Sequence, residues 1–178
     1  MVRIKINEED IIHEHSLRNK KIDIVSCEEH VIEHVQDVTG DVYKLRYLGI
    51  DAEYKPYLAL EKDKVLGYSV VQKYFENYYI GRDKGRRRGE PALVYSLKRK
   101  KGIGSLLFLV SSLEILKDDK VEVFRCEAVE GNVFDRLCSQ LELNFSGKKD
   151  IFNSYELVLE KNNRKNLEDK IKDYLKSL

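Results

Sequence analysis

The stretch that decides the fold covers residues 94 to 105 and reads Val94-Tyr95-Ser96-Leu97-Lys98-Arg99-Lys100-Lys101-Gly102-Ile103-Gly104-Ser105. It follows a strand-like segment at 91–94 and precedes a segment at 104–117 that is rich in Leu, Phe, Ile and Val, which predicts a buried helix. Glycines let a ligand approach the backbone closely, and the first N–H groups of a helix attract anions. The stretch therefore predicts an anion-binding loop, and a diphosphate is its natural ligand.

Positive charge is concentrated around this loop. The whole chain has a formal net charge of +1, yet residues 82–101 carry +7 and the remainder carries −6. A concentrated positive field favours an anionic ligand. For the basic segment 82–88 three interpretations stay open: a surface that guides an acidic substrate such as RNA, a solvated loop, and a loop that contacts a further phosphate of the ligand.

The pattern around the loop predicts a fold of the α/β (α+β) class with a mixed sheet, because strands and helices alternate before a strand finish. Gly67 indicates a bulge or a close backbone approach within its strand, and Ser26 with Glu29 has the form of a capping box. Strands are expected at 2–6, 22–25, 57–61, 65–73, 91–94, 121–129 and 155–159, with a further strand near Phe145. Helices are expected at 27–37, 42–48, 104–117, 131–141 and 166–178, and an exposed loop at 77–89.

The last predicted helix is amphipathic. Its apolar residues form one stripe: Leu167, Ile171, Tyr174, Leu175 and Leu178. A helix of this length is marginal alone, so the stripe must pack either on its own domain or on a partner chain. We accordingly divide the chain into an N-terminal extension (1–21), a main domain (22–160) and a C-terminal helix (161–178), in a monomer or a homodimer.

Composition limits the class of protein. The chain has 178 residues, enough for one domain with its own core, and it is 42% hydrophobic and 35% charged. It has no apolar run long enough to span a membrane and no recognisable signal peptide, and its three cysteines form no CxxC pair. We expect a soluble cytoplasmic protein with reduced thiols and without a metal, although His30 and His34 have a spacing that can chelate one.

The anion-binding loop resembles the signature of the GCN5-related N-acetyltransferase (GNAT) superfamily, Arg/Gln-x-x-Gly-x-Gly/Ala between a strand and a helix. It appears here as Arg99-Lys100-Lys101-Gly102-Ile103-Gly104, and the resemblance extends over about 22–159. It implies a GNAT-like mixed sheet in which the strands 91–94 and 121–129 splay apart around acetyl-CoA. The cofactor-binding residues that it implies are Val94, Tyr95, Arg99, Lys100, Lys101, Gly102, Ile103, Gly104, Ser105 and Asn132.

The resemblance also implies an activity, the transfer of an acetyl group from acetyl-CoA to a primary amine by direct attack. Glu90, at the start of the fourth family strand, is the candidate general base; the alternative is a surface ion pair with the arginines of 86–88. The family tyrosine that usually protonates the leaving thiolate is absent, because Cys138 and Ser139 stand around its position. Cys138 and Tyr155 are weak catalytic candidates, and Tyr95 is a further substitute by residue type. For Cys138 we favour a place in the core over a catalytic role.

Three functions therefore remain open on the sequence. The first is an acetyl-CoA-dependent N-acetyltransferase acting on a small-molecule or protein amine. The second is a non-catalytic acyl-CoA-binding or regulatory module that lacks the acid. The third is a protein that uses the basic segment to bind nucleic acid.

Overall fold

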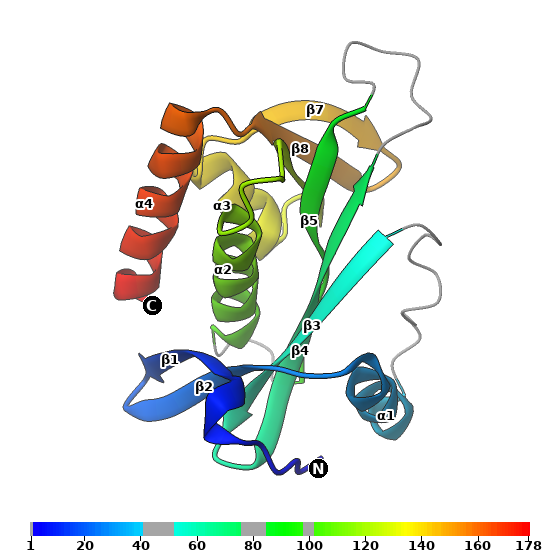
Figure 1. Cartoon of the computed structure of the whole chain (residues 1–178), viewed down its shortest axis with the longest axis vertical. Helices are drawn as coiled ribbons and strands as arrows, with labels where there is room; N and C mark the ends of the chain where they lie inside the picture. Colours follow the sequence, from blue (N-terminus) through cyan, green and yellow to red (C-terminus); the bar gives the residue numbers. More distant parts are fainter. Residues whose placement is uncertain (1, 41–51, 76–84, 98–101) are drawn as a thin grey trace.

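A computed structural model describes residues 2–40, 52–75, 85–97 and 102–178, and within them it forms one eight-stranded sheet with helices on both faces (Figure 1). The strand order is β1-β2-β3-β4-β5-β6-β8-β7. The strands are β1 (Ile11–Leu17), β2 (Lys20–Ser26), β3 (Ala52–Glu61), β4 (Lys64–Phe75), β5 (Arg87–Ser96), β6 (Val123–Val129), β7 (Asn144–Lys149) and β8 (Phe152–Val158). The helices are the short 3-10 helix η1 (Glu8–Asp10), α1 (Glu29–Thr39), α2 (Ile103–Leu116), α3 (Val133–Gln140) and α4 (Lys161–Ser177).

The strands predicted at 57–61 and 65–73 are confirmed as parts of β3 and β4, which form an antiparallel hairpin. Lys62 adopts a left-handed φ of 59° in the turn, which closes the two strands tightly. Gly67 also behaves as expected, because a Cβ there would lie 2.4 Å from the carbonyl oxygen of Tyr95 on β5. Only glycine permits so close an approach of two backbones, so this position fixes the register at the centre of the sheet.

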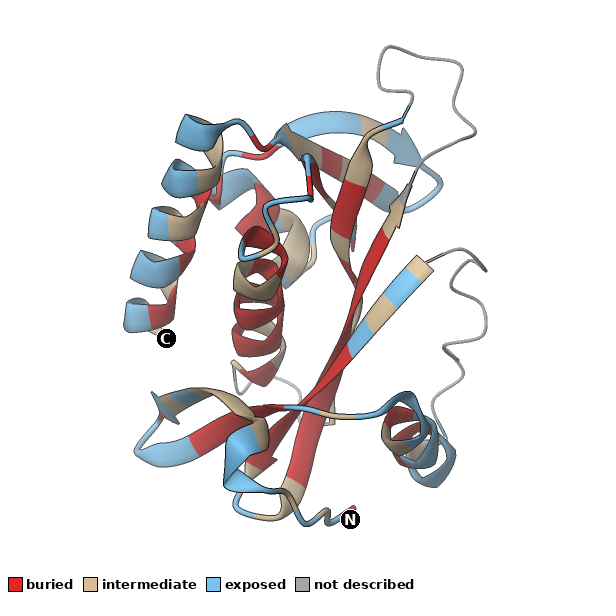
Figure 2. Cartoon of the chain, in the orientation of Figure 1, coloured by how far each residue is buried: buried red, intermediate tan, exposed pale blue. Residues whose placement is uncertain are grey.

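Two hydrophobic cores cover opposite faces of the sheet, and Figure 2 shows the buried residues between the layers. On one face, α2, α3 and α4 pack over the sheet, with fully buried side chains such as Leu106 and Leu109 of α2. On the other face, Ile32 and Val35 of α1 pack against β3 and β4. We call these the α2 face and the α1 face.

The C-terminal helix packs on its own domain. Leu167, Ile171 and Leu175 of α4 are buried in the core that α2 forms. Arg164 ties the two helices together, because its guanidinium donates to the carbonyl oxygens of Leu116 (2.7 Å), Asp118 (3.2 Å) and Val121. Three carbonyls at and beyond the carboxyl end of α2 thus receive hydrogen bonds from a cation, which also suits the helix dipole.

Several predictions from local pattern are wrong. Residues 2–6 form no strand; Arg3 makes one isolated bridge to Lys64, although Val2 is buried. Ser26 belongs to β2 rather than capping α1, whose N-cap is Glu28 without a side-chain hydrogen bond. Helix α4 begins at Lys161, five residues before Asn166.

Other predictions concern the ends and the length of elements. Gly40, with a φ of 70°, ends α1 as expected. The expected loop at 77–89 is partly wrong, because β5 already begins at Arg87 and Arg88 is buried. The expected helix at 42–48 lies outside the described residues.

Candidate active site

The strands β5 and β6 form the only parallel pair among the described strands, and they separate after two residue pairs. Arg88 pairs with Val123 and Gly89 with Phe124, and beyond these pairs the two strands diverge. Strand β5 also carries a β-bulge beside the divergence, since Pro91 pairs with Val71 and Leu93 with Val70, which leaves Ala92 without a partner on β4. The sequence prediction that these two strands splay apart is confirmed.

A cleft of about 420 Å³ occupies the gap between the separating strands. Its walls are mostly apolar, and Phe108 of α2 stacks on Phe134 of α3 inside it, with ring centroids 5.5 Å apart. The residues that line it are Tyr68, Pro91, Ala92, Leu93, Val94, Tyr95, Phe108, Glu127, Ala128, Val129, Asn132, Phe134, Ile151 and Phe152. A long, mainly apolar chain with a few polar groups would fit such a cleft.

Helix α2 begins beside this cleft, on the α2 face. Its N-cap Gly102 has a φ of 78°, and the place of its missing Cβ is 3.4 Å from Leu17 of β1. A Cβ on Gly104 would lie 3.3 Å from the Phe134 ring, so this glycine leaves room for a cleft residue. The N–H groups of the first helical turn, from Ile103 to Ser105, have no acceptor within the helix itself, and such groups are a typical site for an anion.

The predicted cofactor residues fall into three groups. Val94, Tyr95 and Asn132 line the cleft, and the Asn132 side chain also caps α3 by accepting from the Asp135 N–H at 2.8 Å. Gly102 to Ser105 form the start of α2. Arg99, Lys100 and Lys101 lie outside the described residues.

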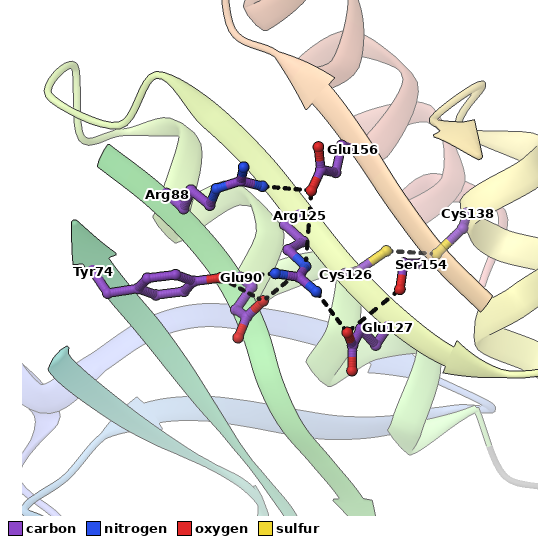
Figure 3. A network of polar contacts seen from close by, with 9 residues as sticks. All are labelled: Tyr74, Arg88, Glu90, Arg125, Cys126, Glu127, Cys138, Ser154 and Glu156. Atoms are coloured by element: carbon purple, nitrogen blue, oxygen red, sulfur yellow. Dashed lines mark hydrogen bonds and ion pairs between the residues drawn. The ribbon is translucent and has the colours of Figure 1, made fainter. Parts of the chain in front are cut away.

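A polar cluster lies on the α1 face next to the same gap, and it contains Glu90 (Figure 3). The Tyr74 hydroxyl donates to Glu90 Oε2 at 3.5 Å, and Arg125 Nε is 3.9 Å from the same oxygen. Arg125 also donates to Tyr74 at 3.3 Å and to Glu127 at 2.7 Å. Glu127 is itself part of the cleft wall, so the cluster reaches into the cleft.

Burial gives Glu90 an unusual carboxyl group. Its side chain is 17% exposed, and its two polar contacts are long. Burial is the main cause that raises the pKa of Glu90 to about 7; Arg125 lowers it and Glu127 raises it further. A carboxyl group with this pKa can accept a proton near neutral pH.

The neighbouring arginines are engaged inside the protein. Arg88 forms an ion pair with Glu156 of β8, and Arg87 contacts Glu53 at 2.8 Å and Asp118 at 3.7 Å. The predicted basic surface at 82–88 is therefore corrected for these two residues, whose charges are compensated by carboxylates. Residues 82–84 lie outside the described part of the chain.

The two weaker catalytic candidates lie behind the sheet rather than in the cleft wall. Cys138 is fully buried in α3, and its Sγ is 2.8 Å from Sγ of Cys126 on β6 (Figure 3). Tyr155 is buried beneath α3, and its hydroxyl donates to Asp135 at 2.7 Å. Burial, and then this hydrogen bond, raise the pKa of Tyr155. Both side chains thus have structural contacts, and neither lines the cleft.

No group of three or more metal-ligating side chains comes together within the described residues, where His30 and His34 are exposed on α1. Nor does any helix of the described part have the length and apolar character that crossing a membrane requires.

Sequence reasoning missed Tyr74, Arg125 and Glu127 as neighbours of Glu90. The alternation of side chains in strands could have identified Arg125 and Glu127 as members of one face of β6. Their meeting with Glu90 depends on the pairing of β6 beside β5, which is a long-range feature.

Comparison with known proteins supports the fold. No protein-family model and no curated protein matches the sequence. Among solved structures, the GNAT domain of S. lividans PAT is 13% identical and superposes with a TM-score of 0.57, over 87% of this chain and 100% of that one.

Two further structures give similar values. NAA60 of Arabidopsis thaliana, in complex with acetyl-CoA, has a TM-score of 0.54 at 12% identity, over 78% of this chain and 98% of that one. An uncharacterised protein from Bacillus halodurans has a TM-score of 0.59 at 11% identity, over 93% of this chain and 96% of that one. The chain therefore has a GNAT-like fold.

Proposed function

We propose that this protein is an acetyl-CoA-dependent N-acetyltransferase that acts on a primary amine. The observation that carries the proposal is the opposite chemistry of the two faces at the gap between β5 and β6. The amino end of α2, which attracts anions, lies on one face, and the carboxylates of Glu90 and Glu127 lie on the other. An anionic cosubstrate and a cationic amine would therefore approach the gap from opposite sides.

Acetyl-CoA fits the α2 face. Its diphosphate would bind the N–H groups at Ile103 to Ser105, and its pantetheine arm would lie in the cleft along β5, near Val94 and Tyr95. The bulge at Ala92 interrupts the pairing of β5 with β4 beside the cleft, and the acyl end would lie next to this irregular backbone. The fold neighbour NAA60 is a protein with a GNAT-like fold that binds acetyl-CoA, which agrees with this assignment.

Glu90 serves as the general base on the α1 face. Glu90 lies one residue before Pro91, where the cleft wall begins, and is not itself part of that wall. It therefore takes the proton of the amine through a water molecule. The amine nitrogen forms a bond to the thioester carbonyl carbon, and the carbon–sulfur bond then breaks. The products are the acetylated amine and CoA, whose thiolate takes up a proton from solvent.

The proposal is tested first at the cofactor loop. We expect Gly104→Glu to lower acetyl-CoA affinity by about 30-fold or more in isothermal titration calorimetry, because the new side chain would enter the space between Phe134 and Ser96 with a negative charge. The fold should survive, since an acidic residue is favourable in a first helical turn. Gly147→Glu is the matched control, because a Cβ on Gly147 has open space around it and β7 lies at the far edge of the sheet.

Unchanged acetyl-CoA affinity in a folded Gly104→Glu protein would reject the cofactor site. Release of free thiol from acetyl-CoA provides the second measurement. If acetyl-CoA binds but no thiol is released, with or without amines, the chain is an acyl-CoA-binding module rather than an enzyme.

A further inference from the structure

Three exposed apolar residues form one wall of the cleft at the ends of β6 and β8. Val129 is 36% exposed, Phe152 is 37% exposed and Ile151 is 59% exposed. Val129 and Phe152 are paired across the two strands, and the Ile151 carbonyl accepts from the N–H of Glu130 at 2.8 Å. We call Val129, Ile151 and Phe152 the apolar rim. Grouped apolar exposure beside a cleft is typical of a surface that binds a ligand.

Two residues of the apolar rim, Val129 and Phe152, lie on the same face of the sheet as the carboxylates. Along β6, Arg125 contacts Glu90 on the α1 face, whereas Cys126 contacts α3 on the opposite face. Side chains alternate along a strand, so Glu127 and Val129 share the α1 face with Arg125. Phe152 shares it too, since residues directly opposite in a ladder point the same way.

The rim therefore begins two residues after a carboxylate that is also in the cleft wall. The Glu127 side chain is 48% exposed, so a ligand can reach it. A ligand bound here meets negative charge at one end and apolar surface at the other. This arrangement suits a molecule with one ammonium group and an apolar substituent.

We propose that the acceptor is a primary amine with an apolar substituent, whose ammonium group binds near Glu127 and Glu90 and whose substituent packs on the apolar rim. The inference rests on the proposed function and names the substrate class of the same site. It distinguishes monoamines with an alkyl or aryl group from di- and polyamines.

The rim disfavours a second ammonium group on the acceptor. A distal ammonium placed on the rim would lose water without gaining a hydrogen-bond partner from these side chains. Lys149 of β7 is paired with Phe152 in the ladder, so it adds positive charge on that side of the rim.

The test uses two isosteric amines, hexylamine and 1,5-diaminopentane, which differ by a terminal methyl group in place of an ammonium group. With full-length protein and saturating acetyl-CoA, we expect kcat/KM for hexylamine to exceed that for the diamine by about tenfold or more. The reason is that the methyl end is buried favourably while the ammonium end is desolvated. Equal values, or a preference for the diamine, would overturn the inference.

Substitutions in the rim test whether it causes the preference for hexylamine. Ile151→Ser and Phe152→Ser should each reduce the ratio of the two kcat/KM values by about threefold or more. Val158→Ser is the matched control: Val158 is 38% exposed on β8, six residues from Phe152 and thus about 20 Å away along the strand. The control should keep the wild-type ratio; a fall in the control equal to that in the rim variants would overturn the assignment.

Acetyl-CoA binding, measured separately by calorimetry, distinguishes failure of the proposed function from failure of the substrate class inferred here. If acetyl-CoA does not bind, the proposed function fails and the inference falls with it. If acetyl-CoA binds and neither amine reacts, saturation-transfer NMR of hexylamine with the CoA complex decides. Saturation transfer to the alkyl protons in the wild type that is lost in Phe152→Ser would support binding of the substituent on the rim. Absence of transfer in the wild type would reject it.

Discussion

Two charge clusters occupy the same strands, β4 and β5, but lie on opposite faces of the sheet. On the α2 face, Lys73 donates to Asp118 at 2.6 Å, and Arg87 bridges Asp118 and Glu53. On the α1 face, the next residue of β4, Tyr74, contacts Glu90 at 3.5 Å. Residues adjacent in the chain thus belong to two environments with different chemistry.

We call Lys73, Arg87, Asp118 and Glu53 the Lys73 cluster, and its opposite charges are closely paired. The Lys73 side chain is only 4% exposed, and a short hydrogen bond from it is the main cause that lowers the pKa of Asp118. A buried cation with a close carboxylate is well compensated, and removing one partner leaves the other uncompensated.

The Glu90 carboxyl group, in contrast, is poorly paired. Its contacts are 3.5 and 3.9 Å long, and burial keeps its pKa at about 7. The comparison teaches that the sheet keeps one carboxylate ionised by close pairing and leaves another able to exchange a proton. Three predictions test this difference.

The largest expected effect is on catalysis. Glu90→Gln should lower turnover of an amine acceptor by about 100-fold or more while acetyl-CoA affinity is retained, because the amide cannot accept a proton. In the wild type, kcat/KM should rise with pH up to about 7, where Glu90 becomes ionised, and the variant should lack this limb. Glu53→Gln, from the other cluster, is the control and should keep wild-type turnover.

Near wild-type turnover in Glu90→Gln would move the base to another group. An equal loss in Glu53→Gln would show that the assay responds to a general defect of the sheet.

The second effect is on stability and concerns the Lys73 cluster. Asp118→Asn should lower the free energy of unfolding by about 3 kcal/mol at pH 7, because Lys73 would remain buried without its close carboxylate. Urea denaturation measures the change. A loss below about 0.5 kcal/mol would mean that Arg87 and Glu53 carry the cluster without Asp118.

The third effect has the opposite sign. The pKa of Glu90 is raised in the folded protein, so folding favours the protonated carboxyl group. The stability that Glu90 contributes is therefore fully present below pH 4.5, the ordinary pKa, and is lost as the pH rises through about 7. Each pKa step of one is worth about 1.4 kcal/mol, so the shift from 4.5 to about 7 predicts that Glu90→Gln stabilises the protein by about 3 kcal/mol at pH 8. At pH 4 the two proteins should be equally stable.

Urea midpoints across this pH range check the prediction. A variant that is less stable than the wild type at pH 8 would show that ionised Glu90 is well compensated, contrary to the comparison.

The local sequence around Val94 to Ser105 determined much of the fold. A strand, two glycines and an apolar helix in this order predicted a strand that leads through a tight loop into α2, and the family resemblance implied that β5 and β6 splay apart. The amphipathic stripe of α4 was equally readable, because a helix of that pattern must bury one side. Glu90 was identified as a candidate base from its place in the resemblance, not from its surroundings.

Elements without a strong local signal could not be predicted. Strand β1 has no clear apolar alternation, and it exists because β2 offers it a pairing edge. Segment 2–6 alternates like a strand, yet beyond one bridge it gains no partner within the described residues. In both cases tertiary pairing overrides propensity.

The sequence by itself determined the order of strand, glycine-containing loop and apolar helix around residues 91–117. It could do so because these features depend on residues a few positions apart in the chain. Only the tertiary structure decided that Tyr74, Glu90, Arg125 and Glu127 meet on one face, next to the apolar rim. These residues come from three strands, and β6 is placed beside β5 only after the chain has crossed over through α2. Side-chain alternation assigns each residue to one of two faces, but long-range pairing decides which faces coincide.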